Sequence, residues 1–376
     1  MSKKRGNGEG SIHRRKGGGW CAQYTVYTAK GRKRKTLYGR TRAEVAAKLS
    51  KALSEREGGI NFDAGNLTLE DYLDRWLTAS VRDTVRLRTW ERYEQIARLH
   101  IKPVLGRLRL KALTPTHVRS LYREKLDTGL APRTVLYIHT TLHKALKDAV
   151  ADALVPRNVT EGIKAPRPKR KEVNALSANQ SQIFLSMARG DRFEALYVVA
   201  VHCGLREGEL LGLRWEDIDF DTGTLAVRRT LSETKSSGHI FEPPKNGKGR
   251  NVRLTYSAID ALKRHSAAQN EERLRLGTLW QGQGLVFPSR KGTTMNAKNL
   301  TARSFKPILE RAELPNIRLH DLRHTCATLL LSKGVHPKLV QELLGHATIS
   351  ITLDTYSHVL PGMGDQTATA MESLLS

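Results

Sequence analysis

Apolar residues recur at helical spacing along most of this chain, and shorter stretches near its start alternate as β-strands do. Trp20–Tyr27 alternates, Lys30-Gly31 forms a turn, and Arg32–Tyr38 follows as a second strand with basic residues on at least one face. Helical spacing begins at Thr41. Residues 1–58 therefore predict a small β-sheet with one helix.

After a polar linker at 59–66, residues 67–163 carry four apolar stripes that each fit one face of a helix. Threonine caps and first-turn prolines, both typical of helix N-termini, mark most of their starts. The stripes begin at Thr68, near Trp90, at Thr114-Pro115 and at Pro132. We expect the second helix to close before Pro103, because proline removes a helical hydrogen bond. This region predicts an all-helical domain.

The segment 164–171 holds five basic residues and two prolines, which predicts an extended basic linker. In the domain that follows, 172–376, an apolar helix ends at Gly204. Leu225–Leu231 reads as a strand, and Val252–Leu254 is its expected partner across a long loop. The predicted fold class is therefore multidomain and mainly α with small β-sheets, and the last domain is α+β.

The chain is strongly basic, with 63 Lys and Arg against 37 Asp and Glu and a net charge of +26. Such an excess indicates a polyanionic partner, which could be DNA, RNA or an anionic membrane. No apolar run approaches the ~20 residues that span a bilayer, and the N-terminus has no signal-peptide core, so a membrane partner is disfavoured. Three separated cysteines, Cys21, Cys203 and Cys326, indicate free thiols in a reducing cytosol.

The candidate chemistry is concentrated near the C-terminus. His320 and Arg323 lie three residues apart, so one helical turn brings them side by side. A second helix ends at Gly345 and delivers His346 just beyond its last turn, and Tyr356 follows. Arginine forks bind two phosphate oxygens, histidine moves protons near neutral pH, and tyrosine can form an ester to phosphorus. The set is suited to phosphoryl transfer.

The boxes around these residues, HDLRH, LGH and TLDTYSH, resemble those of the tyrosine recombinases of the phage-integrase family. A further box, HCGLREGELLGLRWEDID at 202–219, extends the resemblance over most of the C-terminal half. The resemblance is to the arm-binding, three-domain type of this family. The resemblance implies an arm-type DNA-binding domain at 1–58, a helical core-binding domain at 67–163 and an α+β catalytic domain at 172–376.

The function implied is site-specific DNA recombination, which integrates or excises a mobile element such as a prophage through a 3′-phosphotyrosyl intermediate. The implied partners are double-stranded DNA with core-type and arm-type sites, further copies of the chain in a homotetramer, and DNA-bending and directionality proteins. The implied location is the cytosol and nucleoid of a bacterial host. No cofactor is expected, neither ATP nor a metal, because the arginines supply the charge and the phosphotyrosine keeps the bond energy.

The resemblance also assigns roles to residues. Tyr356 is the nucleophile, Arg206 and Arg323 clamp the phosphate, His320 positions or deprotonates the nucleophile, and His346 hydrogen-bonds the phosphate.

The general acid is expected to be a lysine of the loop before Val252. Lys245 and Lys248 are both candidates, and the preceding Pro243-Pro244, which would fix its position, favours Lys245. Glu209 and Asp321 are expected to orient arginines or cap helices.

DNA contacts are expected where basic and aromatic residues interleave, although a solvated surface is the plain alternative for such charges. The candidates are Trp20, Lys33, Arg34, Lys35 and Tyr38 in the N-terminal sheet, Arg88 and Arg92 in the helical domain, and Lys169 and Arg170 in the basic linker.

Two other functions compete with recombination. His320 and His324 have the four-residue spacing of zinc hydrolases, but this leaves Arg206 and Tyr356 without a role. A non-catalytic DNA-binding regulator of the same fold would be favoured by a missing catalytic residue, and none is missing.

Overall fold

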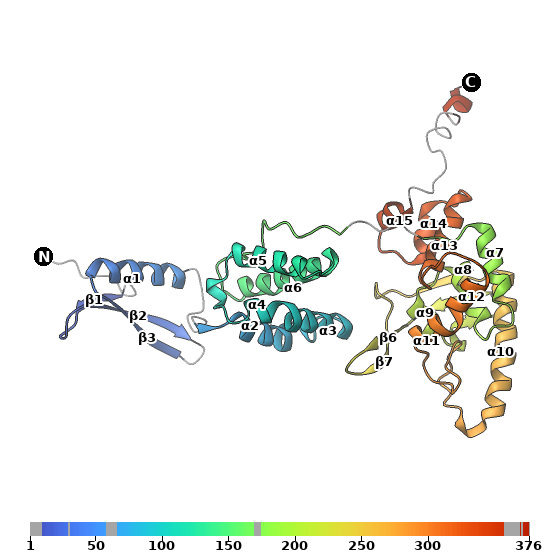
Figure 1. Ribbon diagram of the computed structural model, residues 1–376, viewed down its shortest axis with the longest axis horizontal. Helices are drawn as coiled ribbons and strands as arrows, with labels where there is room; N and C mark the ends of the chain where they lie inside the picture. The colour runs from blue at the N-terminus through green and yellow to red at the C-terminus, as the bar shows by residue number, and fades with distance from the viewer. Residues whose placement is uncertain are drawn as a thin grey trace. The chain divides into compact units, whose positions relative to one another are not determined.

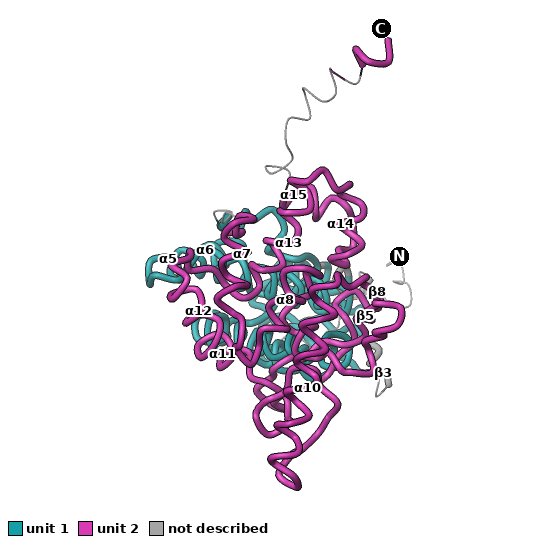
Figure 2. Tube along the Cα trace, turned by 90° about the vertical axis from the view of Figure 1, so that its right-hand side faces the viewer, with its two compact units in different colours: residues 1–170 teal, residues 171–376 magenta. Residues whose placement is uncertain are grey.

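The computed structural model describes residues 10–28, 31–57, 66–168, 174–356, 369 and 371–375. They belong to two compact units, Met1–Arg170 and Lys171–Ser376, which Figure 2 colours separately. The first unit holds two separate hydrophobic clusters, and the second holds one large and one small cluster. None of the helices among these residues is long and apolar enough to cross a membrane.

The chain begins with a three-stranded antiparallel sheet, covered on one face by helix α1 (Figure 1). Its elements are β1 (Ser11–Arg14), β2 (Trp20–Thr28), β3 (Gly31–Gly39) and α1 (Arg42–Glu57). Ala22 and Tyr24 of β2 pack against Val45 and Leu49 of α1. The alternation of the sequence predicted β2 and β3, whereas β1 is short and stable only as a third strand beside β2.

The second cluster of the first unit is helical, and every described regular element in it is a helix. Thr68 and Thr114 cap two of the helices with their hydroxyls, as the sequence predicted. The helices are α2 (Leu69–Arg75), η2 (Trp76–Val81), α3 (Leu87–Ile96), η3 (Ala97–Ile101), α4 (Lys102–Leu105), η4 (Leu110–Ala112), α5 (Pro115–Asp127) and α6 (Pro132–Ala151).

The prediction that the second of these helices closes before Pro103 was wrong. Helix α3 continues into η3, which is a π-helical segment, and η3 continues into α4. Pro103 lies in the first turn of α4. The wider π-helical turn changes the hydrogen-bond register before the proline, so the missing N–H is tolerated there and the chain passes on without a break.

The second unit combines a mainly helical body with two small sheets (Figure 1). Its strands are β4 (Ile218–Asp219), β5 (Thr224–Val227), β6 (Thr230–Thr234), β7 (Gly238–Glu242) and β8 (Arg250–Arg253). Its helices are α7 (Ala178–Met187), α8 (Glu194–Cys203), α9 (Glu207–Leu211), η5 (Trp215–Asp217), α10 (Tyr256–Leu276), η6 (Gly277–Leu279), α11 (Ala297–Leu300), η7 (Thr301–Phe305), α12 (Lys306–Arg311), α13 (Asp321–Ser332), α14 (Pro337–Leu344) and α15 (Ile349–Tyr356).

The single strand expected at Leu225–Leu231 is in fact two strands. β5 pairs with β8, which contains part of the segment expected to be its partner. β6 lies outside this sheet and pairs with β7 as a separate hairpin. Arg229 lies at the break, where its guanidinium donates to Asp217 Oδ2 at 2.7 Å and Glu216 Oε1 at 2.9 Å. These ion pairs join residues 12 and 13 positions apart in the sequence, so the alternation of apolar residues does not reveal them.

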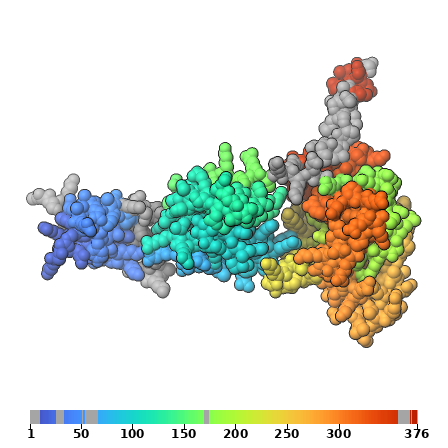
Figure 3. Space-filling model, viewed as in Figure 1, coloured from blue at the N-terminus to red at the C-terminus, as the bar shows by residue number. Residues whose placement is uncertain are grey.

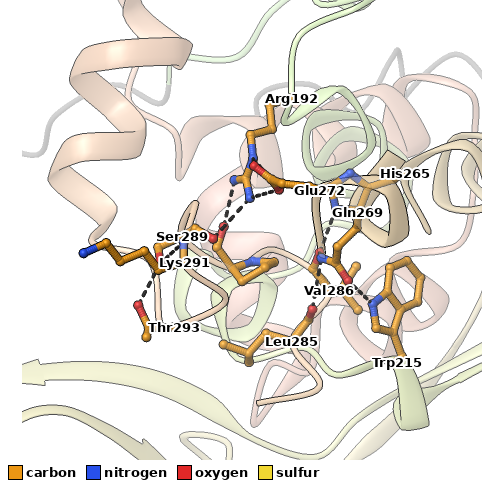
Figure 4. Close-up of polar contacts among 11 residues, drawn as sticks. Arg192, Trp215, His265, Gln269, Glu272, Leu285, Val286, Ser289, Lys291 and Thr293 are labelled. Atoms are coloured by element: carbon orange, nitrogen blue, oxygen red, sulfur yellow. Dashed lines mark hydrogen bonds and ion pairs between the residues drawn. The ribbon is translucent and has the colours of Figure 1, made fainter. Parts of the chain in front are cut away.

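Helix α10 is fixed to the body of this unit by partly buried polar contacts (Figure 4). Arg192 donates to Glu272 of α10 and to the carbonyl of Pro288, and Gln269 accepts from Trp215 Nε1 at 2.6 Å. The far end of α10 and the residues after it form a projecting lobe of the unit (Figure 3). The near end packs on α8, whose last turn leads into the candidate site.

Candidate functional site

Two glycine turns bring the candidate residues of the second unit together. Helix α8 ends at Gly204, whose φ of +61° suits glycine, and a side chain there would lie 2.7 Å from Leu344 Cδ2. The tight turn makes Arg206 the N-cap residue of α9. Helix α14 ends at Gly345, with φ of +64°, and His346 follows it. Both helix ends were predicted from the glycines.

The carboxylate of Glu209 is the centre of the charged network at this site. Its oxygens accept from Arg206 Nη1 at 2.7 Å and from Arg206 N at 2.9 Å. They also accept from Arg250 Nη1 at 3.0 Å and Nη2 at 2.7 Å. Glu209 therefore orients Arg206, as expected, and its second arginine partner, from β8, was not anticipated.

Glu209 is buried, with only 2% of its surface exposed. Burial by itself would raise the pKa of its carboxyl, but the hydrogen bonds and charges of Arg250 and Arg206 overcome this and lower the pKa to about 2. The carboxylate is thus ionised throughout the physiological range and holds two guanidinium groups side by side.

The carbonyl of Gly345 links this network to the loop that carries the candidate general acid. Arg206 Nη2 and Asn246 Nδ2 both donate to it, each at 3.0 Å. Lys245 lies next to Asn246 in a turn closed by the bond from Gly247 N to Pro244 O, 2.8 Å long. Lys245 and Lys248 are both exposed. The loop is thus attached at Asn246, one residue from Lys245 and two from Lys248.

Arg323 reaches the site from the first turns of α13 and is almost fully buried. Its Nη1 donates to the carbonyl of Gly204 at 2.8 Å. Among the described residues, nothing accepts a hydrogen bond from Nη2, which is buried as well. Burial and the neighbouring charge of Arg206 lower the pKa of Arg323 to about 9, so the group still carries its charge at neutral pH. A buried cation with an unsatisfied donor needs an anion or another acceptor.

His320 and His346 lie at the same site. Burial, with His324 and Arg323 nearby, lowers the pKa of His320 to about 4. Burial, with the charges of Arg323 and Arg206, lowers the pKa of His346 to about 4 as well, and His346 Nδ1 is 2.9 Å from Thr352 Oγ1. Both imidazoles are therefore neutral at pH 7, each with one N–H to donate.

Tyr356 ends helix α15 and its ring packs in a small apolar cluster. Only 1% of it is exposed, and its hydroxyl lies 2.6 Å from His324 Nδ1. Burial raises the pKa of the phenol to about 12, although the charge of Arg323 acts in the opposite direction. The hydrogen-bond partner of the candidate nucleophile is thus His324, which the sequence had suggested only as a zinc ligand.

The two histidines of the zinc alternative have other neighbours in the structure. The rings of His320 and His324 meet edge to face with centroids 5.2 Å apart, and His324 Nδ1 is occupied by Tyr356. Within the described part of the chain, no three His, Cys, Asp or Glu side chains are grouped as metal ligands. Asp321 binds the main-chain N–H and guanidinium of Arg318 and so acts as a local cap.

The candidate DNA-binding residues of the N-terminal sheet do not share one face. The register pairs Ala22 with Leu37 and Tyr24 with Lys35, which puts Lys35 on the side of α1. Trp20 also packs against that core. Arg34 and Tyr38 lie on the opposite face, where Arg15 stacks over the Tyr38 ring at 4.9 Å. By alternation, Lys33 lies with Lys35.

The candidates in the helical region are Arg88 and Arg92, both exposed on α3. The guanidinium of Arg92 lies 3.9 Å above the Tyr137 ring of α6. Lys169 and Arg170 fall outside the described residues, as does most of the C-terminal tail.

Family comparisons match both halves of this architecture. The model of the phage integrase family matches residues 169–362, and that of the phage integrase N-terminal SAM-like domain matches residues 68–126. A tyrosine recombinase XerC-like protein of Caldanaerobacter subterraneus subsp. tengcongensis is 33% identical over 360 residues, covering 91% of each chain. An integrase of Streptomyces ambofaciens is 29% identical, covering 95% of this chain and 94% of its own.

Solved structures share the fold. The Tn1549 transposon integrase, in complex with transposon right end DNA, superposes with a TM-score of 0.68 at 21% identity and covers 82% of this chain and 100% of its own. A lambda integrase tetramer bound to a Holliday junction superposes with a TM-score of 0.56 at 19% identity and covers 96% of this chain and 99% of its own.

The geometry of Glu209 predicts how stability depends on pH. The folded pKa of about 2 lies below the ordinary value of 4.5, so the carboxylate stabilises the fold fully above pH 4.5 and loses this contribution as the pH falls towards 2. We expect Glu209→Gln to lower the free energy of unfolding by about 3–5 kcal/mol at pH 7, because two partly buried guanidinium groups lose their buried anion. The difference from wild type should narrow as the pH falls from 4.5 towards 2.

Urea unfolding at a series of pH values measures this difference. The exposed Glu271→Gln, on α10, is the matched control and should leave the urea midpoint unchanged. If the free energy of unfolding of Glu209→Gln stays below that of wild type by the same amount down to pH 2, the ionic role of the carboxylate would be contradicted.

Proposed function

The chain belongs to the phage integrase family of tyrosine recombinases and is a site-specific DNA recombinase, and we propose that Tyr356 is the nucleophile with which it cleaves and rejoins DNA strands. The observation that carries the proposal is the position of the Tyr356 hydroxyl. It lies at a histidine–arginine site whose carboxylates, Glu209 and Asp321, are each bound by arginine side chains, so the site as a whole is suited to a phosphodiester.

In the proposed reaction, Arg206 and Arg323 clamp the two non-bridging oxygens of the scissile phosphate. The buried Nη2 of Arg323, which lacks an acceptor among the described residues, supports this role, because a phosphate oxygen would satisfy it. Arg206 is held by Glu209 and the carbonyl of Gly345, so its fork is positioned before DNA arrives. Such preorganised charge lowers the barrier without a cost of reorganisation.

Histidine and lysine side chains complete the proposed machinery. His346, neutral and next to the end of α14, donates a hydrogen bond to the phosphate. His320 positions the nucleophile from the start of α13. Lys245 protonates the departing 5′ oxygen, and the attachment of its loop at Asn246 supports this choice over Lys248. Tyr356 then carries a 3′-phosphotyrosyl bond, and attack by a 5′-hydroxyl of another strand reverses the step.

The wider assembly follows from the same proposal. The chain acts on the core-type sites of a mobile element, as a homotetramer on double-stranded DNA, in the cytosol and nucleoid of a bacterial host. Its helical region, 67–163, and its catalytic region, 172–376, grip the core site, and residues 1–58 bind a separate arm-type site. DNA-bending and directionality proteins control the direction of exchange. The relatives that carry integrase names support this picture.

Removing the Tyr356 hydroxyl tests the nucleophile. Tyr356→Phe keeps the ring in its apolar cluster, so folding and DNA binding should change little. Cleavage should disappear, because no other atom at this position can form the phosphate ester. The measurement is the SDS-resistant protein–DNA adduct on a nicked duplex that contains the attachment core of the encoding element. An adduct formed by Tyr356→Phe would refute the assignment of the nucleophile.

The choice between the two lysines can be tested on the leaving group. Lys245→Ala should lose cleavage on normal DNA and recover it on a substrate whose bridging 5′ oxygen is replaced by sulfur, because a thiolate leaves without a proton. Lys248→Ala is the matched control and should cleave both substrates like wild type. Rescue of Lys248→Ala alone would reverse the assignment.

Deleting the N-terminal sheet tests the arm-type site. A chain that starts at Asn66 should still form the adduct on a core site, since the described catalytic residues lie in the second unit. It should lose the binding of the full chain to DNA flanking the core, measured by footprinting at several salt concentrations. Arg34→Ala should weaken that flanking protection, whereas Lys48→Ala, on α1, is the control for charge loss elsewhere in the domain. Unchanged flanking protection after the deletion would contradict the proposal.

A further inference from the structure

The strongest contact of the Tyr356 hydroxyl is with a residue outside the set of six assigned above. His324 lies on α13, one turn after His320, so the two rings share one face of the helix. Its Nδ1 is 2.6 Å from Tyr356 Oη, which is a short hydrogen bond. No hydrogen bond joins His320 to Tyr356 among the described residues. The group within reach of the phenolic proton is therefore His324.

The direction of this hydrogen bond follows from the surroundings. Burial lowers the pKa of His324, and Arg318 and Arg323 act the same way, while Asp321 opposes them. The pKa of Tyr356 is raised to about 12. At neutral pH the phenol therefore keeps its proton and donates it to a neutral imidazole, whose own hydrogen is on Nε2. Among the described residues, the titratable and charged groups that face His324 are Arg318, His320, Asp321, Arg323, His346 and Tyr356.

A phenol in this environment needs a proton acceptor in order to attack. With a pKa of about 12, roughly one molecule in 10⁵ is ionised at pH 7. An aligned base removes this limitation, because the proton leaves as the new bond forms. The Tyr356–His324 pair has the arrangement of an activated nucleophile, with the base in hydrogen-bond contact before substrate binds.

We propose that His324 is a catalytic residue, the general base that accepts the proton of Tyr356 through Nδ1 as Oη attacks the phosphorus. The proposal rests on the function proposed above. The Oη–P bond forms, the bond from phosphorus to the 5′ oxygen breaks, and the departing oxygen takes a proton from the general acid on the loop. His324 becomes an imidazolium. When a 5′-hydroxyl of another strand reverses the step, its proton passes to the deprotonated general acid on the loop, and His324 returns its own proton to the departing phenolate oxygen.

The test uses His324→Asn in the full chain. Asparagine places its Oδ1 near the position of Nδ1, so the hydrogen bond from Tyr356 can persist, but the amide cannot take up a proton. On the nicked attachment-core duplex at pH 7, single-turnover adduct formation should fall by about 10²- to 10⁴-fold. The difference from wild type should shrink by roughly tenfold per pH unit up to about pH 9, because the ionised fraction of the phenol rises in that proportion.

Two features separate a base from a merely structural residue. The 5′-thio substrate should not rescue His324→Asn, because its defect lies on the side of the nucleophile. Added imidazole should partly restore His324→Ala, in which the ring is missing. The matched control is His336→Asn, at the exposed N-cap of α14, which should form the adduct at the wild-type rate.

Other outcomes would overturn the proposal. Wild-type rates in His324→Asn at pH 7, or a defect that is constant with pH, would mean that His324 takes no proton. Faster adduct formation by His324→Ala would mean that the hydrogen bond restrains Tyr356 in the resting chain. In both cases the wild-type chain would still form its adduct at Tyr356, so the proposed function would be unaffected. Absence of that wild-type adduct would instead refute the proposed function.

Discussion

The buried carboxylate of Glu209 is the interaction on which the geometry of the site depends. It holds guanidinium groups from two separate elements, Arg206 before α9 and Arg250 on β8. Each arginine then reaches a carbonyl at the end of α14, Gly345 for Arg206 and Leu343 for Arg250. One negative charge therefore fixes three elements that are far apart in the sequence. Without it, two cations would face each other in a region of low dielectric.

The network leaves positive charge at the site without a matching anion. Glu209 is occupied by its two arginines, while Arg323 is buried with one donor unsatisfied among the described residues. The pKa values of Arg323 and His346 are both lowered by burial and by the neighbouring cations, which is the signature of a site that lacks an anion. In the proposed reaction a phosphodiester supplies that anion, and its binding would offset the free-energy cost of assembling these cations.

The parts of this structure that depend on residues close together in the sequence were predictable from it. The caps at Thr68 and Thr114, the glycine that ends α14 and the spacing that joins His320 to Arg323 are local signals, and the structure has all of them. The errors have different causes: the helix through Pro103 continues by way of the π-helical η3, whereas the break between β5 and β6 coincides with contacts between residues distant in the sequence. Arg229, at that break, forms ion pairs with Asp217 and Glu216, which lie 12 and 13 residues before it.

At the site, too, sequence motifs identify some residues, whereas contacts between residues far apart in the sequence identify others. Family resemblance identified the six candidate residues, but Arg250 and His324 contact partners 41 and 32 residues away. His324 closes the HDLRH box, yet the resemblance gave it no role. His324 was visible only as the second histidine of a four-residue repeat, a spacing shared by metal ligands and by neighbours on any helix face. What distinguishes the two is the occupant of Nδ1, and that occupant, Tyr356, is placed there by the packing of α15 against α13 and α14. The proposed nucleophile and its partner are therefore brought together by tertiary packing, so their pairing can be recognised only in the folded chain.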